Sequence, residues 1–205
     1  MWSNSAMTTR ALHRVIGIVM LLPLTGWAIT GAIFFLKPGY ADAYELLQVK
    51  TYPLESNIAT RTDPAWLEAR FVKTVLGEHL LARTSRGWIH LDPFTMQPRP
   101  EPSADDLDAL VTDAFSANPA RYGRVASIEG DVITTNTGVR VELDWNRLAL
   151  TQTGKDTDRI DTLYKIHYLQ WTGIKGVDKV LGGLGILLVL ALSLLGARLF
   201  FGKGW

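Results

Sequence analysis

Two of the four histidines in this chain stand beside long apolar segments, where an imidazole is unusual and chemically useful. His13 comes just before an apolar run from residue 15 to 36, and His167 lies upstream of a second run from 180 to 197. A neutral imidazole presents one N–H donor and one nitrogen lone pair, so it can ligate a metal or a prosthetic group. A histidine at a helix end can equally be a polar residue that hydrogen-bonds a backbone carbonyl. Both interpretations stay open for His13 and His167.

The composition excludes several kinds of chemistry. The 205 residues contain no cysteine, which rules out disulfides, zinc–thiolate sites, iron–sulfur clusters and thiol nucleophiles. A net charge of +1 argues against nucleic acid as a partner. The sequence has no Ser-His-Asp order, HExxH motif, phosphate loop or dinucleotide fingerprint. We therefore identify no catalytic residue and favour a protein that is not an enzyme.

The remaining two histidines, His79 and His90, lie in segments with the pattern of strands. They are isolated from other ligand residues in the sequence and form no recognisable metal signature. We expect them to be structural. Asp92 and Asp144 each end a strand-like segment, in the pairs Leu91-Asp92 and Leu143-Asp144, and they are expected to organise turns.

The apolar runs set the architecture. Neither contains a charged residue, and at about 1.5 Å per residue they extend roughly 33 and 27 Å, enough to cross a hydrocarbon core of about 30 Å. We predict transmembrane helices over 15–36 and 177–200. The first helix contains Pro23, which predicts a kink. Small residues along both runs predict close helix packing, of the two spans on each other or on a partner.

Basic residues near the ends of the two runs indicate the orientation. Arg10 and Arg14 precede the first run, and Arg198 and Lys203 follow the second. The positive-inside rule then puts residues 1–14 and 201–205 in the cytoplasm of a bacterium and the segment 37–158 outside the inner membrane. The first run is too long for a signal-peptide core and lacks a cleavage site before residue 37, so we expect a retained helix.

The segment 37–158 reads as a folded α+β domain. Ser103 begins the clearest helix, whose apolar face is predicted to comprise Leu107, Leu110, Val111, Ala114 and Phe115. Asp63-Pro64 is expected to start a short helix over 65–70. Strands are predicted at 46–52, 71–76, 79–84, 88–92, 124–128, 132–135, 139–143 and 148–152.

A weak internal similarity suggests two repeats, about 46–100 and 103–153. In both, a Gly-bearing hairpin leads to a strand that ends in Leu-Asp, followed by a turn and another short strand. Helix followed by antiparallel strands, twice, predicts helix packed on sheet. Chance similarity between hairpins is the alternative.

The segment 159–176 is predicted to be an amphipathic helix at the membrane interface. Apolar and aromatic residues recur at spacings of three and four, with His167 on the apolar side. Tyr164, Tyr168 and Trp171 are residues of the kind found at the interfacial belt.

Several of these motifs resemble one family. The pieces Leu12-His13-Arg14-Val15-Ile16-Gly17, Thr25-Gly26 and Thr30-Gly31 resemble the first membrane helix of PepSY-associated transmembrane proteins. His167 with Trp171-Thr172-Gly173, before the glycine-rich second run, resembles a later membrane segment of that family. Leu91-Asp92-Pro93-Phe94-Thr95 resembles the Asp-Pro-x-Thr strand end of PepSY domains.

The resemblance implies an iron-regulated inner-membrane protein, in some members one that reduces ferric siderophores and binds haem b through membrane histidines. The family has about four spans and this chain has two. His13 and His167 are expected near opposite faces of the membrane, so each would be an axial haem ligand only with a second copy or another subunit.

Two functions therefore compete. The chain is either a non-catalytic accessory subunit that docks on other membrane subunits through its spans and PepSY-like domain, or a haem b electron carrier with ferric-reductase-like activity. The lipid bilayer is a partner in both. A hydrolase or protease inhibitor outside the cytoplasm is a distant third, which rests only on the association of PepSY domains with peptidase regulation.

Overall fold

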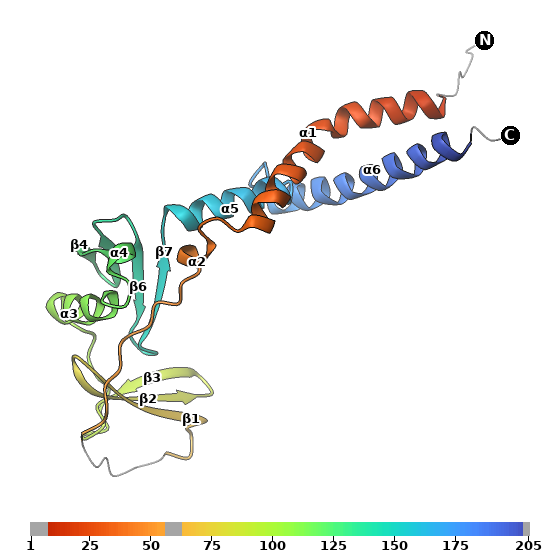
Figure 1. Ribbon diagram of the computed structural model, residues 1–205. Helices are drawn as coiled ribbons and strands as arrows, with labels where there is room; N and C mark the ends of the chain where they lie inside the picture. The colour runs from red at the N-terminus through yellow and green to blue at the C-terminus, as the bar shows by residue number, and fades with distance from the viewer. Residues whose placement is uncertain (1–7, 56–62, 203–205) are drawn as a thin grey trace. The chain divides into compact units, whose positions relative to one another are not determined.

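The computed structural model describes residues 8–55 and 63–202, which form two compact units. A helical unit contains the chain up to Gly39 and from Asp158 onward, and an α+β unit contains Tyr40–Thr157. The structure thus has a long apolar helix at each end of the chain and, between them, a region of helices and two antiparallel sheets (Figure 1).

The helical unit is built from three helices, α1 (Thr9–Leu36), α5 (Lys155–His167) and α6 (Lys175–Phe201). Helix α5 begins at the end of the α+β unit and continues into the helical unit. Helices α1 and α6 are each long and apolar enough to cross a membrane. Helix α1 contains Pro23 and bends along its length, as Figure 1 shows. A proline removes one backbone hydrogen bond and crowds the preceding turn, which accounts for the bend.

Glycines let α1 and α6 approach closely, as predicted. A Cβ added at Gly17 would lie 3.7 Å from Leu192, and one added at Gly196 would lie 3.4 Å from the His13 ring. A Cβ at Gly185 would come within 2.7 Å of Leu169 and 3.4 Å of Trp27. The two helices are therefore packed antiparallel over most of their length.

The helix bounds differ from those expected near both histidines. Helix α1 begins at Thr9, with Thr8 as its N-cap, so His13 lies inside the helix. Helix α5 starts earlier than predicted and ends at His167. The chain leaves the helix because Leu169 (φ 56°) and Gly173 (φ 73°) adopt left-handed conformations. The segment 168–174, predicted as part of one helix, is therefore a turn before α6.

The α+β unit contains two antiparallel meanders. The first is β1 (Glu68–Thr74), β2 (Gly77–Thr84) and β3 (Gly87–Leu91), and the second is β4 (Val125–Glu129), β5 (Val132–Thr135), β6 (Arg140–Asp144) and β7 (Ala149–Thr153). Three helices complete the unit: α2 (Tyr40–Ala43), α3 (Ala104–Phe115) and α4 (Pro119–Tyr122).

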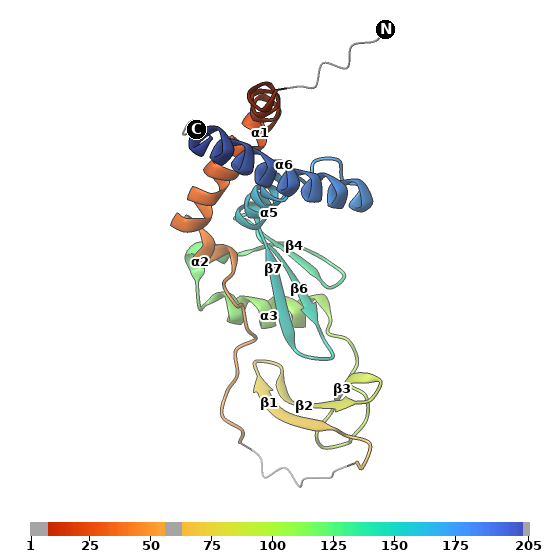
Figure 2. The ribbon, with the colours of Figure 1, turned by 90° about the vertical axis from the view of Figure 1, so that its right-hand side faces the viewer.

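Helix α3 lies across the four-stranded sheet and covers the core (Figure 2). All five residues predicted for its apolar face are buried: Leu107, Leu110, Val111, Ala114 and Phe115. They pack with residues of β5, β6 and β7 and with Leu81 of β2, so both sheets contribute to one core. Ser103 caps the helix in a capping box with Asp106. The predicted helix-on-sheet arrangement is confirmed.

Two local predictions were wrong. The helix expected over 65–70 is a turn followed by β1, which pairs with β2 from Glu68 to Thr74. Asp63 accepts hydrogen bonds from Ala65 and Trp66 in this turn rather than capping a helix. The strand expected over 46–52 is extended chain with two isolated bridges, at Gln48 and Tyr52. In both places pairing with distant strands decides the conformation, and local propensity does not.

The two meanders share a turn geometry. Asp92 directly follows β3 and Asp144 is the last residue of β6, and in each meander the residue four positions later is left-handed: Met96 (φ 61°) and Leu148 (φ 47°). The Asp92 carboxylate accepts from the backbone of Phe94 and Thr95. The two predicted repeats, 46–100 and 103–153, differ in their helices. Helix α3 precedes the second meander, but the described part of 46–100 has no helix before the first meander.

Candidate functional sites

His167 is held by α1 at the end of α5. Its Nδ1 lies 2.8 Å from the Thr30 hydroxyl, and its backbone carbonyl accepts from the Trp27 indole. Thr30 donates its own hydrogen to the Gly26 carbonyl at 2.6 Å, so the hydroxyl must accept from His167 Nδ1–H. The tautomer is therefore fixed, and the Nε2 lone pair of the neutral ring remains available.

Aromatic rings complete the surroundings of His167. Phe34 contacts the imidazole edge-on with centroids 5.2 Å apart, and Tyr168 does so at 5.4 Å. Phe34 itself stacks on Tyr164 at 4.7 Å. A hydrogen bond from Nδ1 to a fixed acceptor is the arrangement that orients a histidine for ligation through Nε2. The sequence could not show this contact, because Thr30 and His167 are far apart along the chain.

His13 lies near the other end of α1, against Gly196 of α6. Its Nδ1 is buried and has no hydrogen-bond partner among the described residues. Residues 13 and 30 are about 26 Å apart along α1 at about 1.5 Å per residue. His13 and His167 are thus in different places in the helical unit, and one chain does not bring them together.

A second pair of histidines is brought together in the α+β unit. His79 on β2 and His90 on β3 are buried, with 0% and 3% of their surfaces exposed, and His79 Nδ1 lies 2.9 Å from His90 Nε2. His90 Nδ1 must donate to the Trp145 carbonyl at 2.9 Å, which leaves its Nε2 to accept from His79. The Thr74 hydroxyl then donates to His79 Nε2 at 2.8 Å.

This chain of hydrogen bonds, from Thr74 through His79 and His90 to Trp145, is fully satisfied with both rings neutral. Burial lowers the pKa of His79 to about 3 and that of His90 to about 4. The nearby Arg99 guanidinium contributes to both of these lowered pKa values. We interpret the pair as a buried structural link between the two sheets, because every ring nitrogen is already used.

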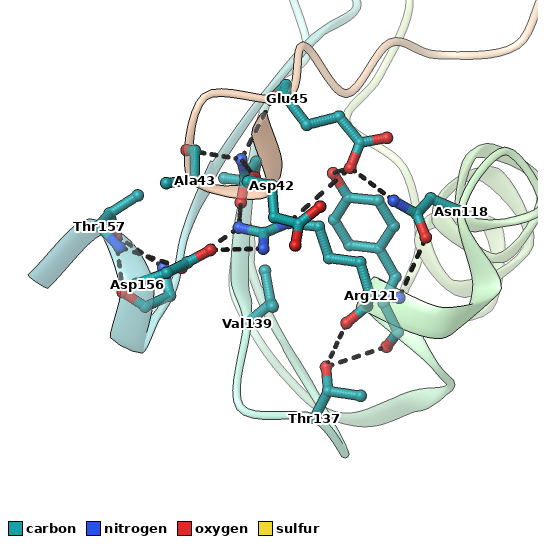
Figure 3. A network of polar contacts seen from close by, with 12 residues as sticks. Asp42, Ala43, Glu45, Asn118, Arg121, Thr137, Val139, Asp156 and Thr157 are labelled. Atoms are coloured by element: carbon teal, nitrogen blue, oxygen red, sulfur yellow. Dashed lines mark hydrogen bonds and ion pairs between the residues drawn. The ribbon is translucent and has the colours of Figure 1, made fainter. Parts of the chain in front are cut away.

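A polar network joins the two segments through which the chain enters and leaves the α+β unit (Figure 3). The Arg121 side chain is 8% exposed and donates to Asp156 at 2.6 Å and to Gln152 at 2.6 Å. Gln152 in turn donates to backbone carbonyls of Asp42, Ala43 and Glu45 at 3.1–3.3 Å. Arg121 therefore ties residues 42–45 to residues 152–156.

The charged groups of this network contact one another, with Arg121 between the carboxylates of Asp156 and Glu45. Burial is the largest influence on Asp156 and would raise its pKa, but the hydrogen bonds from Arg121 and from the Thr157 backbone, together with the Arg121 charge, outweigh it and lower that pKa. Burial and the Glu45 carboxylate raise the pKa of Tyr122 to about 12. The Tyr122 hydroxyl and the Asn118 amide both donate to Glu45. Because its groups bind one another, we assign the network a structural role; no sequence motif pointed to Arg121.

Comparison with protein-family models, with characterised proteins and with solved structures found no match. Within the described residues, no group of three or more His, Asp or Glu side chains is arranged to hold a metal ion. The function is therefore argued from the residues and surfaces of the chain itself.

Proposed function

We propose that this chain is a non-catalytic accessory subunit of the bacterial inner membrane, of the PepSY-associated type. Helices α1 and α6 cross the membrane with both termini in the cytoplasm, and the α+β unit lies in the periplasm. In this arrangement the helices dock on another membrane protein of a redox or iron-uptake complex, and the α+β unit is an interaction domain.

The observation that carries the proposal is the uncovered apolar surface of the helical unit. In the most apolar part of each helix, few residues are buried within the protein. Side chains such as Leu22 (70% exposed), Leu187 (64%) and Leu194 (72%) point outward. In water an apolar surface of this extent would drive aggregation, whereas lipid or another membrane helix covers it without cost.

Two glycines mark where a further helix can approach. A Cβ added at Gly31 of α1 or at Gly183 of α6 would meet nothing within 4 Å, so neither is needed for the contact between these helices. Small residues on an open helix face allow close approach by another helix in lipid. This supports docking on a partner in addition to the α1–α6 contact.

The test is copurification from mild detergent followed by native gel electrophoresis. We expect the wild-type chain in an assembly larger than its monomer, and Gly31→Leu to release it because the new side chain fills the open face. Leu22→Phe, which adds bulk on the opposite side of α1, is the control and should leave the assembly intact. A wild-type chain that extracts with carbonate would refute the membrane anchor. One that stays membrane-bound but always migrates as a monomer would refute the accessory role.

The geometry of His167 favours a second candidate, a haem b electron carrier that passes electrons toward ferric iron. Its Nδ1–H is anchored on Thr30 and its Nε2 lone pair is free, which fits an axial ligand. Because His13 lies about 26 Å away along α1, a second chain would have to complete each site.

An absorption spectrum of the detergent-purified protein separates the two candidates. A Soret band that disappears in His167→Gln, in a dimeric protein, would support the carrier. A colourless protein in a larger assembly would support the accessory subunit. Thr30→Val is the informative partner variant, since it removes the acceptor for Nδ1–H and should weaken haem retention without removing the ligand.

A further inference from the structure

The turn between α5 and α6 forms one wall of an open pocket with a volume of about 980 Å³. The other walls are the end of α5 and the first turns of α6. Three lysines line it, Lys165, Lys175 and Lys179, together with the aromatic rings of Tyr168 and Trp171. Two of its lining residues were met above, Tyr168 beside His167 and Gly183 on the open face of α6, but the three lysines belong to none of the sites described.

A glycine keeps the pocket open, and several contacts hold the turn between α5 and α6 in place. Gly183 lines it, and a Cβ there would meet nothing within 4 Å. Leu169 of the turn is 6% exposed and packs against Gly185 of α6. On the other side, Asp178 accepts from the Thr172 backbone at 3.0 Å and from its hydroxyl at 2.7 Å. The wall is thus held in place by contacts that do not involve the lysines.

The pocket carries more positive than negative charge, because three lysines and one carboxylate, Asp178, line it. Asp178, the carboxylate among its lining residues, is occupied by Thr172. Within the described residues, no carboxylate lies within 4.0 Å of the ammonium groups of Lys165, Lys175 and Lys179. Three free ammonium groups around a hollow suit an anion with several oxygens, such as a phosphate group.

The stretch of α6 that follows the pocket lysines in the sequence is apolar. The uncharged run of α6 begins at Val180, next to Lys179, and Val180 and Leu184 are 68% and 49% exposed. Tyr168 and Trp171, 57% and 51% exposed, are side chains of the type that gathers at membrane–water interfaces. A ligand with a phosphate head and acyl chains would contact both parts, whereas a free phosphate would contact the upper part alone.

We propose that this pocket binds the headgroup phosphate of an anionic phospholipid in the periplasmic leaflet of the membrane. The proposal rests on the membrane insertion of α1 and α6 proposed above. The lysines hold the phosphate, Trp171 and Tyr168 lie at the level of the glycerol backbone, and the acyl chains follow the exposed side chains of α6.

Quenching of Trp171 by brominated lipids tests this with the full-length protein in vesicles. The signal of Trp171 is the difference between the wild type and Trp171→Phe. Brominated phosphatidylglycerol, diluted into phosphatidylcholine, should quench this signal more strongly than brominated phosphatidylcholine at the same fraction. Each lysine near an anionic headgroup contributes about a five-fold preference, so replacing all three by Gln should lower the preference about a hundred-fold.

Controls separate the pocket from general surface charge and from soluble phosphate. Lys37→Gln removes a charge at the end of α1, outside the pocket, and should leave the preference unchanged, whereas Lys179→Gln should lower it. Glycerol 3-phosphate, the headgroup chemistry without acyl chains, should not displace the lipid. Displacement by this compound would overturn the lipid assignment in favour of a soluble phosphate ligand.

Failure of this proposal is distinguishable from failure of the membrane anchor. If the protein does not float with vesicles on a density gradient, the anchor is wrong and the lipid site falls with it. If the protein floats but both brominated lipids quench Trp171 equally, or if the triple Gln variant keeps the preference, the anchor stands and the lipid site is refuted.

Discussion

Lowering the pH from 7 to 5 is expected to destabilise the α+β unit by about 4 kcal/mol, through two histidines buried within that unit. His79 and His90 have folded-state pKa values of about 3 and about 4, against 6.5 for an ordinary histidine. In the unfolded chain both imidazoles take up a proton as the pH falls below 6.5, and in the folded chain neither does. The unfolded state therefore binds more protons, and stability falls with pH.

The magnitude follows from the linkage relation. Well below pH 6.5 and above pH 4, the unfolded state holds two more protons than the folded state, which gives a slope of about 2.7 kcal/mol per pH unit. Integrated from pH 7 to 5, the loss is about 4 kcal/mol, a large share of the stability of a small domain. Carboxylates with lowered pKa values, such as Asp92 and Asp156, titrate below this window and do not obscure it.

Urea unfolding of the full chain in mild detergent, followed by circular dichroism at pH 7, 6 and 5, measures this slope. His90→Gln should reduce it to about one proton per molecule, and His79→Gln with His90→Gln should abolish it. His167→Gln removes an imidazole outside the α+β unit and should leave it unchanged. A wild-type stability that changes by less than about 1 kcal/mol between pH 7 and 5 would refute the reasoning.

Nitrogen-15 NMR of labelled histidine provides an independent test. The hydrogen-bond chain requires the Nδ1–H tautomer in both rings, since His90 donates from Nδ1 to Trp145 and His79 donates from Nδ1 to His90. Observation of an Nε2–H tautomer in either ring, or of a protonated ring at pH 5, would contradict the assignment.

Two further variants test the frame of the α+β unit. Arg121→Met should destabilise the protein by about 3 kcal/mol in urea unfolding, because the Asp156 carboxylate loses its ion pair with the Arg121 side chain, which is 8% exposed. A loss under about 1 kcal/mol would show that water replaces the guanidinium. Gly123→Ala should lower the melting temperature more than Gly130→Ala. Both glycines have a left-handed backbone (φ 61° and 63°), but only at Gly123 would the new Cβ collide with another residue, Asn136. Equal melting temperatures would show that Asn136 moves aside at little cost.

The candidate sites show where sequence reasoning stops. His167 and His13 were singled out because each stands beside an apolar run, and both do lie in the helical unit. No sequence pattern indicates that His167 bonds to Thr30, or that His79 and His90 are in contact. Residues 79 and 90 look isolated in the sequence, and they become neighbours because β2 and β3 pair in a register that puts His90 opposite Leu81. That register is set by the hairpin at residues 85–86.

The amino-acid sequence by itself determined the elements whose signal is periodic and local. Charge-free runs specify α1 and α6, and the capped, one-sided apolar pattern after Ser103 specifies α3, because a helix satisfies its backbone within a single segment. Tertiary structure decided everything that depends on pairing. Glu68–Thr74 became a strand because β2 supplies its hydrogen bonds, and Arg121 became the link between the two ends of the α+β unit because folding brings Gln152 and Asp156 to it. Hydrogen bonds between distant segments have no period in the sequence, so only the folded chain reveals them.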